Sequence, residues 1–474
     1  MVDQPAAPER HGLFHGVDGG LRGWCAVLGS WLFQFSMIGT LTAFGSYQTF
    51  YQSAWLPAYS ESTIAWVGST QLFLEFFLGV VGGFLLDGGR WRLAVGGGSV
   101  LFAFSFFMLS LCKQGQYAPV FLSQGVGMGV GLGFAFLPLH GIIAKHFTRR
   151  RSLAMGIITT GTSLGGFAFS VLASKLFSTR LGFAWTVRVC EFITLGCILL
   201  GNVLMSEPKE KKMEKAQVEE KLPVTPADSS ATAATTMVSS ETQKGSPNST
   251  ERAATAGDLH ESSGSDVEAV TSSTDEKPRT IPQLLRDPAY LAIISSGFIA
   301  GLGLYFPMFA IQSFALEHGI SPGIADWLLS IMNLSGVLGR TIPNWMADRY
   351  GTLELYVPCT AAAGGLVIAL GAATSPGSIV VVSILYGFFA GSIVSLYFPT
   401  VCALDPHVTS TGARLGIACL PVGLAALVGT PIAEALVGEG GQWWRGVGFA
   451  GATELASAVL LAFAWAVERR RKGK

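Results

Sequence analysis

The chain has 474 residues, of which 50% are hydrophobic and 13% are charged, and its formal net charge is zero. Soluble domains usually carry about 25% charged residues, and here the stretch 207–280 alone holds 14 acidic and 9 basic residues, which leaves 39 charges for the other 400. These figures exclude a water-soluble globular enzyme, a nucleic-acid-binding protein and a disulfide-rich secreted domain, and they predict that lipid surrounds most of the chain.

Twelve mostly apolar runs follow one another, each long enough to cross a bilayer core of about 30 Å as a helix. The first six cover about 24–50, 62–86, 92–112, 118–144, 152–177 and 184–206, and the other six about 288–316, 324–347, 354–374, 377–403, 413–437 and 442–467. Residues 1–20 are polar and Gly-rich and have no signal-peptide pattern, so the first run is expected to direct membrane insertion.

The segment between the two sets of runs is rich in Ser, Thr, Ala and Glu, and it cannot bury enough apolar area to offset its chain entropy. We therefore predict a disordered cytosolic linker at 207–285. The other expected parts are a cytosolic tail at 1–23, a six-helix bundle at 24–206, a second at 286–467 and a basic cytosolic tail at 468–474.

Lys and Arg gather in the loops of one side, as at Arg90, Lys145 and Arg349 and in the tail from Arg469. Because short cytosolic loops are enriched in basic residues, both termini are predicted to be cytosolic. A multi-pass protein of the plasma membrane is expected, with a vacuolar or peroxisomal membrane as the alternative.

The two halves also repeat each other at a nearly constant spacing. Asp87 after the second run and Asp348 after the eighth are 261 residues apart, and so are Glu207 and Glu468 at the ends of the sixth and twelfth. Six-plus-six repeats are typical of transporters whose halves rock about a central site.

Two sets of motifs then resemble a known family. Gly83, Asp87 and Arg90 after the second run are similar to the signature of the major facilitator superfamily. Two further motifs resemble those of its monocarboxylate-porter family in the fungal form, one before the first run (Asp18, Gly19, Gly20, Arg22, Trp24) and one at the fifth (Lys145, Phe147, Arg149, Arg150, Arg151, Leu153, Ala154, Gly156, Gly161, Gly165). The resemblance implies an all-α membrane protein with twelve transmembrane helices in two six-helix pseudo-repeats and transport by alternating access.

Ionisable residues deep in a span are costly and predict function. Arg340 in the eighth run lies where the family resemblance implies a carboxylate-binding arginine, and a guanidinium suits that task chemically; the alternative is that Arg340 reaches the cytosolic face. Glu75 in the second run is the candidate for proton coupling, or else a neutral Glu bonded to a neighbouring helix. Further polar and aromatic residues are expected to contact the substrate: Asn333, Gln48, Tyr47, Tyr305, Gln312 and Tyr386.

A cytosolic gate is predicted from charges that would pair at the helix ends. The residues assigned to it are Asp87, Arg90, Arg149, Arg150, Arg151, Glu207, Asp348, Arg349, Arg414 and Glu468. The alternative is that these arginines set the membrane topology alone. Surface ion pairs of up to about 1 kcal/mol each are enough to bias two states that differ by a few kcal/mol.

The chain differs from the animal lactate carriers, which are members of the monocarboxylate-porter family that it resembles. They have an Asp one turn before the arginine, where this chain has Gly336, and a Lys in the first helix, where it has none. The main hypothesis is a secondary active transporter of a small organic anion, with possible proton coupling. The alternative is an exporter or intracellular transporter of a larger, more apolar fungal metabolite, with Arg340 structural.

No enzyme activity and no cofactor are expected, since the sequence holds no nucleophile–base pair or phosphate-binding loop. The seven cysteines stand singly and lack metal-site spacing, so no metal is expected. The predicted partners are a small-molecule substrate, membrane lipid and protons, with no nucleic acid; the oligomeric state, the solute and the direction of transport stay open.

Overall fold

The computed structural model describes residues 19–147, 150–177, 179–207, 283, 285–404, 411–438 and 440–472. Within these ranges every regular element is helical. The predicted tail before Gly19, most of the predicted linker and Arg149 lie outside the described residues.

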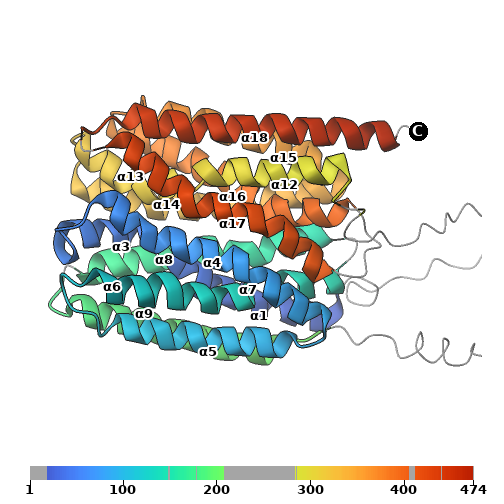
Figure 1. Ribbon diagram of the computed structural model, residues 1–474, viewed down its shortest axis with the longest axis horizontal. Coiled ribbons are helices and arrows are strands. Elements are labelled where there is room, and N and C mark those ends of the chain that lie inside the picture. Colours follow the sequence, from blue (N-terminus) through green and yellow to red (C-terminus); the bar gives the residue numbers. More distant parts are fainter. Residues whose placement is uncertain are drawn as a thin grey trace, which may run out of the picture. The chain divides into compact units, whose positions relative to one another are not determined.

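Six helical segments make up the first half (blue to green in Figure 1). The first segment changes between α-helical and π-helical turns, while the fourth begins with a short α turn and a π-helical stretch. The elements are α1 (Gly20–Phe33), η1 (Gln34–Ile38), α2 (Gly39–Thr42), α3 (Phe44–Phe50), η2 (Tyr51–Trp55), α4 (Glu61–Asp87), α5 (Trp91–Leu109), α6 (Tyr117–Val120), η3 (Phe121–Gly127), α7 (Met128–His146), α8 (Arg151–Phe177) and α9 (Gly182–Leu204).

The second half, yellow to red in Figure 1, also has six segments. Its elements are α12 (Pro288–Gly303), α13 (Phe306–Glu317), α14 (Pro322–Tyr350), α15 (Thr352–Leu370), α16 (Pro376–Ala403), α17 (Thr411–Val437) and α18 (Trp443–Lys472). The α12 and α13 helices form one segment that is interrupted at Leu304 and Tyr305. Pro307 contributes to this break because it has no N–H to donate to the preceding turn.

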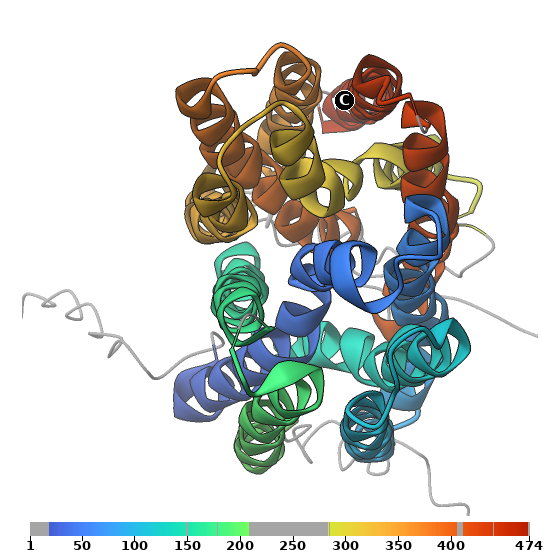
Figure 2. The same cartoon turned by 90° about the vertical axis from the view of Figure 1, so that its left-hand side faces the viewer.

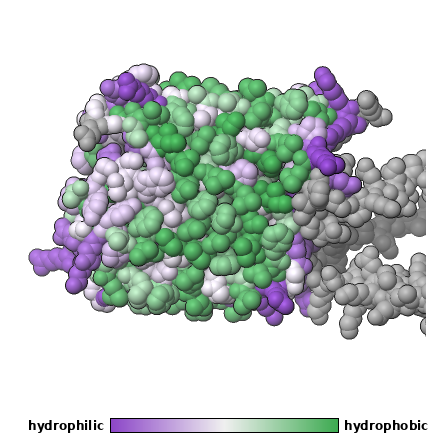
Figure 3. Space-filling model, viewed as in Figure 1, coloured by the Kyte–Doolittle hydropathy of each residue, from purple (hydrophilic) through white to green (hydrophobic). Residues whose placement is uncertain are grey.

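Eleven of the segments are long and apolar enough to cross a membrane, and α14 is the twelfth. It spans 29 residues but carries Asp326, Arg340, Asp348 and Arg349 along with Asn333, which lower its hydropathy. The fold class predicted from the sequence is confirmed. A broad apolar surface lies between two polar ends in Figure 3, as a lipid-embedded helical protein requires.

The two halves meet along two long contacts, one between α4 and α17 and the other between α8 and α14. Figure 2, which looks along the helices, shows the first half below the second.

Within each half, glycines allow the backbones of crossing helices to approach closely. A Cβ on Gly165 would collide with the carbonyl oxygen of Phe35, and one on Gly339 with that of Phe388.

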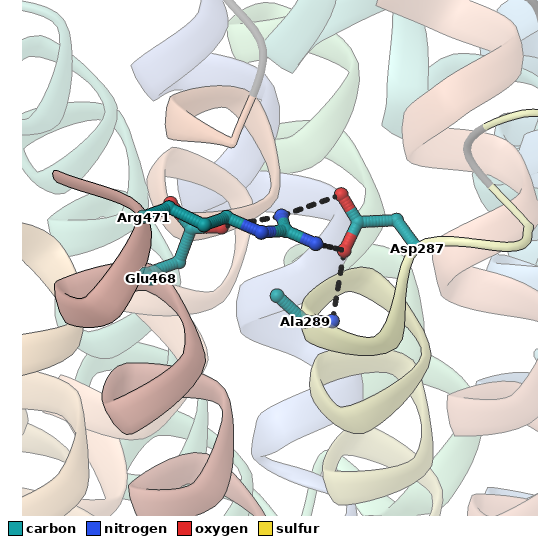
Figure 4. A network of polar contacts seen from close by, with 4 residues as sticks. All are labelled: Asp287, Ala289, Glu468 and Arg471. Carbon is teal, nitrogen blue, oxygen red and sulfur yellow. Dashed lines mark hydrogen bonds and ion pairs between the residues drawn. The ribbon is translucent and has the colours of Figure 1, made fainter. Parts of the chain in front are cut away.

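The start of α12 is held by a polar network that Figure 4 draws. Asp287 accepts a hydrogen bond from the backbone N–H of Ala289 at 2.9 Å, and Arg471 of α18 donates to both of its carboxylate oxygens at 2.9 Å. Burial opposes ionisation of Asp287, but these bonds outweigh it and lower the pKa of its carboxyl. Glu468 accepts from the same Arg471 at 2.9 Å, so its ion pair among the described residues lies on its own helix, and the predicted pairing at the gate is not seen there.

Candidate functional site

A cavity lies in the middle of the helices, between the two halves. Its polar lining is Gln34, Thr42, Glu75, His140, Thr159, Thr162 and Ser163 from the first half and Tyr305, Asn333, Arg340, Tyr356 and Tyr397 from the second. The space open to the centre of a water molecule is about 80 Å³, enough for a few waters but less than a drug-sized molecule needs. In the form described here, the cavity is therefore too small for a bulky solute.

Arg340 is the charged group of α14 that faces this cavity, and its side chain is 5% exposed. Its Nε donates to Oγ of Ser163 on α8 at 2.8 Å, while Nη1 has no hydrogen-bond partner. Among the described residues no carboxylate forms an ion pair with it. A buried cation that keeps a free donor is suited to bind an anionic or carbonyl oxygen.

Gly336 explains why Arg340 has a neutral partner. A Cβ at Gly336 would come 2.8 Å from Oγ of Ser163 and 3.3 Å from the carbonyl oxygen of Gly387. The place where the lactate carriers have an acidic side chain is therefore filled by the Ser163 hydroxyl. Asn333 lies two turns earlier on α14, where its Nδ2 also has no hydrogen-bond partner, so two donors of α14 are available at one side of the cavity.

The first half lines the cavity with a connected polar group. Thr162 donates to Oε1 of Gln34 at 2.7 Å, and Nε2 of Gln34 lies 3.3 Å from Nε2 of His140. His140 also contacts the carbonyl oxygen of Phe136 at 3.1 Å, and its ring lies 4.3 Å from that of Phe398. Gln34 opens the π-helical stretch η1, and such stretches often mark functional positions.

Two further predicted residues reach the cavity, namely Glu75 and Tyr305. Glu75 comes from α4 and is 2% exposed, and Tyr305 lies at the break between α12 and α13. The remaining walls are largely apolar, with Ile38, Leu41, Leu72, Phe76, Met308, Met332 and Phe398 among them. Apolar walls with a few directed polar groups suit an organic ligand.

Four of the predicted substrate contacts do not line the cavity. Tyr386 donates toward the carbonyl oxygen of Leu304 at 2.7 Å, and Gln312 donates to Asp326 at 2.9 Å. Tyr47 is buried in the first half, with its ring 5.3 Å from that of Phe177, and Gln48 is buried nearby on α3. Helical periodicity places these residues inside the protein, but on faces that turn toward neighbouring helices.

The predicted gate has a different chemistry from the one expected. Asp87 accepts from the backbone N–H groups of Gly412 at 3.1 Å and Ala413 at 2.8 Å, at the start of α17. Asp348 accepts from those of Ser152 at 3.1 Å and Leu153 at 3.0 Å, at the start of α8. Each carboxylate thus binds the helix N-terminus of the other half. We call these two contacts the latches, and the end of the molecule that carries them the latch end.

The basic residues assigned to the gate take other partners. Arg349 stacks over Trp345 of its own helix at 4.3 Å, and Nε of Arg151 donates to the carbonyl oxygen of Phe147. Glu207 pairs with Lys145 at 2.6 Å within the first half. Arg90 and Arg150 are exposed, and Arg414 is buried in α17. Among the described residues, the carboxylates of Asp87 and Asp348 thus bind backbone N–H groups of the other half, whereas the sequence led us to expect the basic residues beside them as partners.

Sequence reasoning missed Ser163 and gave His140 no role at the site. A serine in an apolar helix carries little signal, because such hydroxyls usually bond to their own backbone. The clue to Ser163 was present in Gly336, since a missing acid beside a buried arginine calls for another partner.

Two six-helix halves around a central cavity, joined by two matched latches, are the architecture of membrane transporters built from structural repeats. The chain belongs to the Major Facilitator Superfamily, whose family model matches residues 23–300 and 291–474. The protein is thus a membrane transporter of that superfamily, and the family prediction made from the sequence is confirmed at this level.

Its relatives are fungal transporters. The chain is 29% identical to the MFS-type transporter dbaD of Emericella nidulans, over 94% of this chain and 87% of that protein. It is 28% identical to the aspyridones efflux protein apdF of the same fungus, over 97% and 80%. It is also 29% identical to the agnestins efflux protein AgnL12 of Paecilomyces divaricatus, over 87% and 80%. These names do not support the narrower prediction of a monocarboxylate porter.

Proposed function

We propose that this transporter exports a fungal secondary metabolite with an apolar body and an oxygen-rich polar end. The proposal takes up the larger, more apolar solute that the sequence left as the alternative, but it gives Arg340 a binding role. The names of the relatives dbaD, apdF and AgnL12 support a transporter, and two of them name efflux. The observation that carries the proposal is the buried Arg340 guanidinium, bonded to a neutral hydroxyl and left with a free Nη1.

The chemistry of the walls supports the choice of solute. Nη1 of Arg340 and Nδ2 of Asn333 are two buried donors without hydrogen-bond partners. An acceptor oxygen, such as that of a carboxylate, an enolate or a conjugated carbonyl, would satisfy them. Phe76, Met308 and Met332 offer adaptable apolar contact to the rest of the molecule. A short monocarboxylate would leave these walls unused.

The mechanism that fits this chain is alternating access. When the latches at Asp87 and Asp348 hold, the latch end is closed; when they release, α17 and α8 separate from the aspartates and the cavity opens at that end. We infer that the latch end faces the cytosol, because the basic loops lie there, and that the plasma membrane is the site of export. No cofactor takes part in this proposal.

The proposal is tested in the producing fungus by deleting the gene and comparing metabolites inside and outside the cells. We expect at least one metabolite with an acidic or carbonyl group to accumulate inside and to fall outside. Complementation with wild type should restore export, and Arg340→Gln should not. Arg180→Gln, which changes an exposed arginine, is the matched control and should restore it.

A deletion strain with an unchanged division of metabolites would overturn the export proposal. If Arg340→Gln instead restored export fully, the solute would not use the guanidinium, and the structural role for Arg340 would be favoured.

A further inference from the structure

A second buried acid lies directly behind the cavity wall. Glu454 of α18 is 0% exposed, and its Oε1 lies 3.0 Å from the hydroxyl oxygen of Tyr386 on α16. The same hydroxyl lies 2.7 Å from the carbonyl oxygen of Leu304, at the break between α12 and α13. Oε2 of Glu454 has no partner. The three groups form a chain that connects α18 to the break through Tyr386.

The number of hydrogens available for these two hydrogen bonds decides the protonation state of Glu454. The carbonyl oxygen of Leu304 can only accept, and the Tyr386 hydroxyl has a single hydrogen to donate. The Tyr386 hydroxyl lies closer to the Leu304 carbonyl oxygen than to Glu454, so we assign its hydrogen to the bond with Leu304. A hydrogen bond between Tyr386 and Glu454 then needs a hydrogen on the carboxyl of Glu454. An ionised Glu454 would be the stronger acceptor and would draw the Tyr386 hydrogen away from Leu304.

We propose that Glu454 is a proton-binding site that controls the break between α12 and α13. Protonated Glu454 donates to Tyr386, which donates to Leu304 and holds the break in the form described here. Loss of the proton to water turns the Tyr386 hydroxyl toward the carboxylate and frees the Leu304 carbonyl. Glu75, the candidate predicted from the sequence, acts on Tyr305 at the same break through its charge, but no hydrogen bond among the described residues joins its carboxyl to the backbone there.

The break is part of the cavity wall, so the proton and the solute act on the same element. Leu304 and Tyr305 both line the cavity, and Gly387, next to Tyr386, lines it as well. Gly303 packs against the carbonyl oxygen of Ala450, one turn before Glu454, with no room for a side chain. A solute that pushes on the wall at Leu304 would therefore change the proton affinity of Glu454, and the reverse.

The surroundings of Glu454 contain few other charges. Among the described residues, Tyr386 is the titratable group that acts on it. Of the helices packed against α18, α15 presents Gly364 to it and α12 is bonded through Ser457, which donates to the carbonyl oxygen of Ser296 at 2.9 Å. In the described ranges, α13 and α17 direct no charged group at it. Tyr305 acts on Tyr386 from the cavity side.

The first test uses hydrogen exchange of the purified full-length protein in nanodiscs, without any solute. In wild type, the protection of amides around residues 300–310, corrected for intrinsic exchange, should fall about tenfold between about pH 5 and pH 9, as expected for one lost hydrogen bond. Glu454→Gln, whose amide always donates, should stay protected at every pH. Tyr386→Phe should show the lower protection of wild type at pH 9 at every pH.

Glu191→Gln is the matched control, because Glu191 is equally buried and lies in the first half; it should keep the wild-type profile. The second test is infrared spectroscopy, where the C=O signal of protonated carboxylic acids at low pH should be smaller in Glu454→Gln than in wild type by one group.

The proposal fails if Glu454→Gln keeps the full carboxylic acid signal, or if it shares the wild-type pH profile of the break. A flat wild-type profile would also overturn it, even if neither variant folds. The link to transport rests on the proposed function, but these readouts need no solute, so failure of the export proposal would leave their outcome unaffected.

Discussion

The latches allow a quantitative prediction. Asp87→Asn keeps one acceptor oxygen but replaces the other with an NH₂ group, which cannot accept from the second backbone N–H at the start of α17. Asp87 is exposed, so the loss corresponds to a surface helix cap, about 1 kcal/mol. That free energy shifts the ratio of open to closed latch end about fivefold. Because Asp348 makes the same two bonds to α8, the double variant should shift it by about thirtyfold.

The assay is the distance between spin labels on exposed positions of the two halves at the latch end, Arg92 and Tyr350. Labels attached through a ketone amino acid leave the seven native cysteines untouched. We expect the long-distance population to grow in Asp87→Asn and further in the double variant. Arg349→Gln should resemble wild type, because Arg349 stacks on Trp345.

The opposite pattern would refute the reasoning. If Asp87→Asn left the latch end closed, the bonds to the backbone N–H groups of α17 would not hold it. If Arg349→Gln opened it as far as Asp348→Asn does, an ion pair between Asp348 and Arg349 would hold it, as the sequence predicted.

Three further predictions concern packing, pH and the site. Gly165→Ala should cost about 1–3 kcal/mol of stability in thermal unfolding, since its Cβ meets the Phe35 backbone, whereas Gly96→Ala, with open space around it, should be neutral. Asp287→Ala should lower stability by about 1 kcal/mol at neutral pH. Because the pKa of Asp287 is lowered in the folded protein, its contribution is complete above the ordinary value of about 3.9 and is lost as the pH falls through the lowered value, so the difference in Tm should shrink in acid. Gly336→Asp combined with Ser163→Ala should place a carboxylate beside Arg340 and abolish export at unchanged abundance, measured by metabolite profiling and immunoblotting; export at the wild-type level would contradict the role of Arg340.

Hydropathy and charge were sufficient to predict the helical class and the positions of the spans. The predicted run 324–347 became α14 at Pro322–Tyr350, although its polar residues reduce its hydropathy. The same polar residues pointed to the site, because a charge deep in a membrane span needs a partner or a ligand. Arg340 was found in this way, and the structure places it at the cavity.

Contacts between helices that are distant in the sequence could not be predicted in the same way. Nothing in a single sequence says that Ser163 lies opposite Gly336, or that Tyr386 turns toward Glu454 and away from the cavity. The rotation of each helix about its axis decides these contacts, and in lipid no simple apolar periodicity reports it. The sequence assigned Asp87 and Asp348 to the gate but did not predict their partners, because a backbone N–H at a helix start is present whatever the residue type.

The small volume of the central cavity indicates which state of the transporter the structure describes. A bulky solute cannot occupy the cavity in this form, because the cavity has room for only a few waters. If the solute is as large as we propose, the form described here is the empty form of the transporter. The helices around the cavity must then separate before the solute can bind, and they can close around water once it has left.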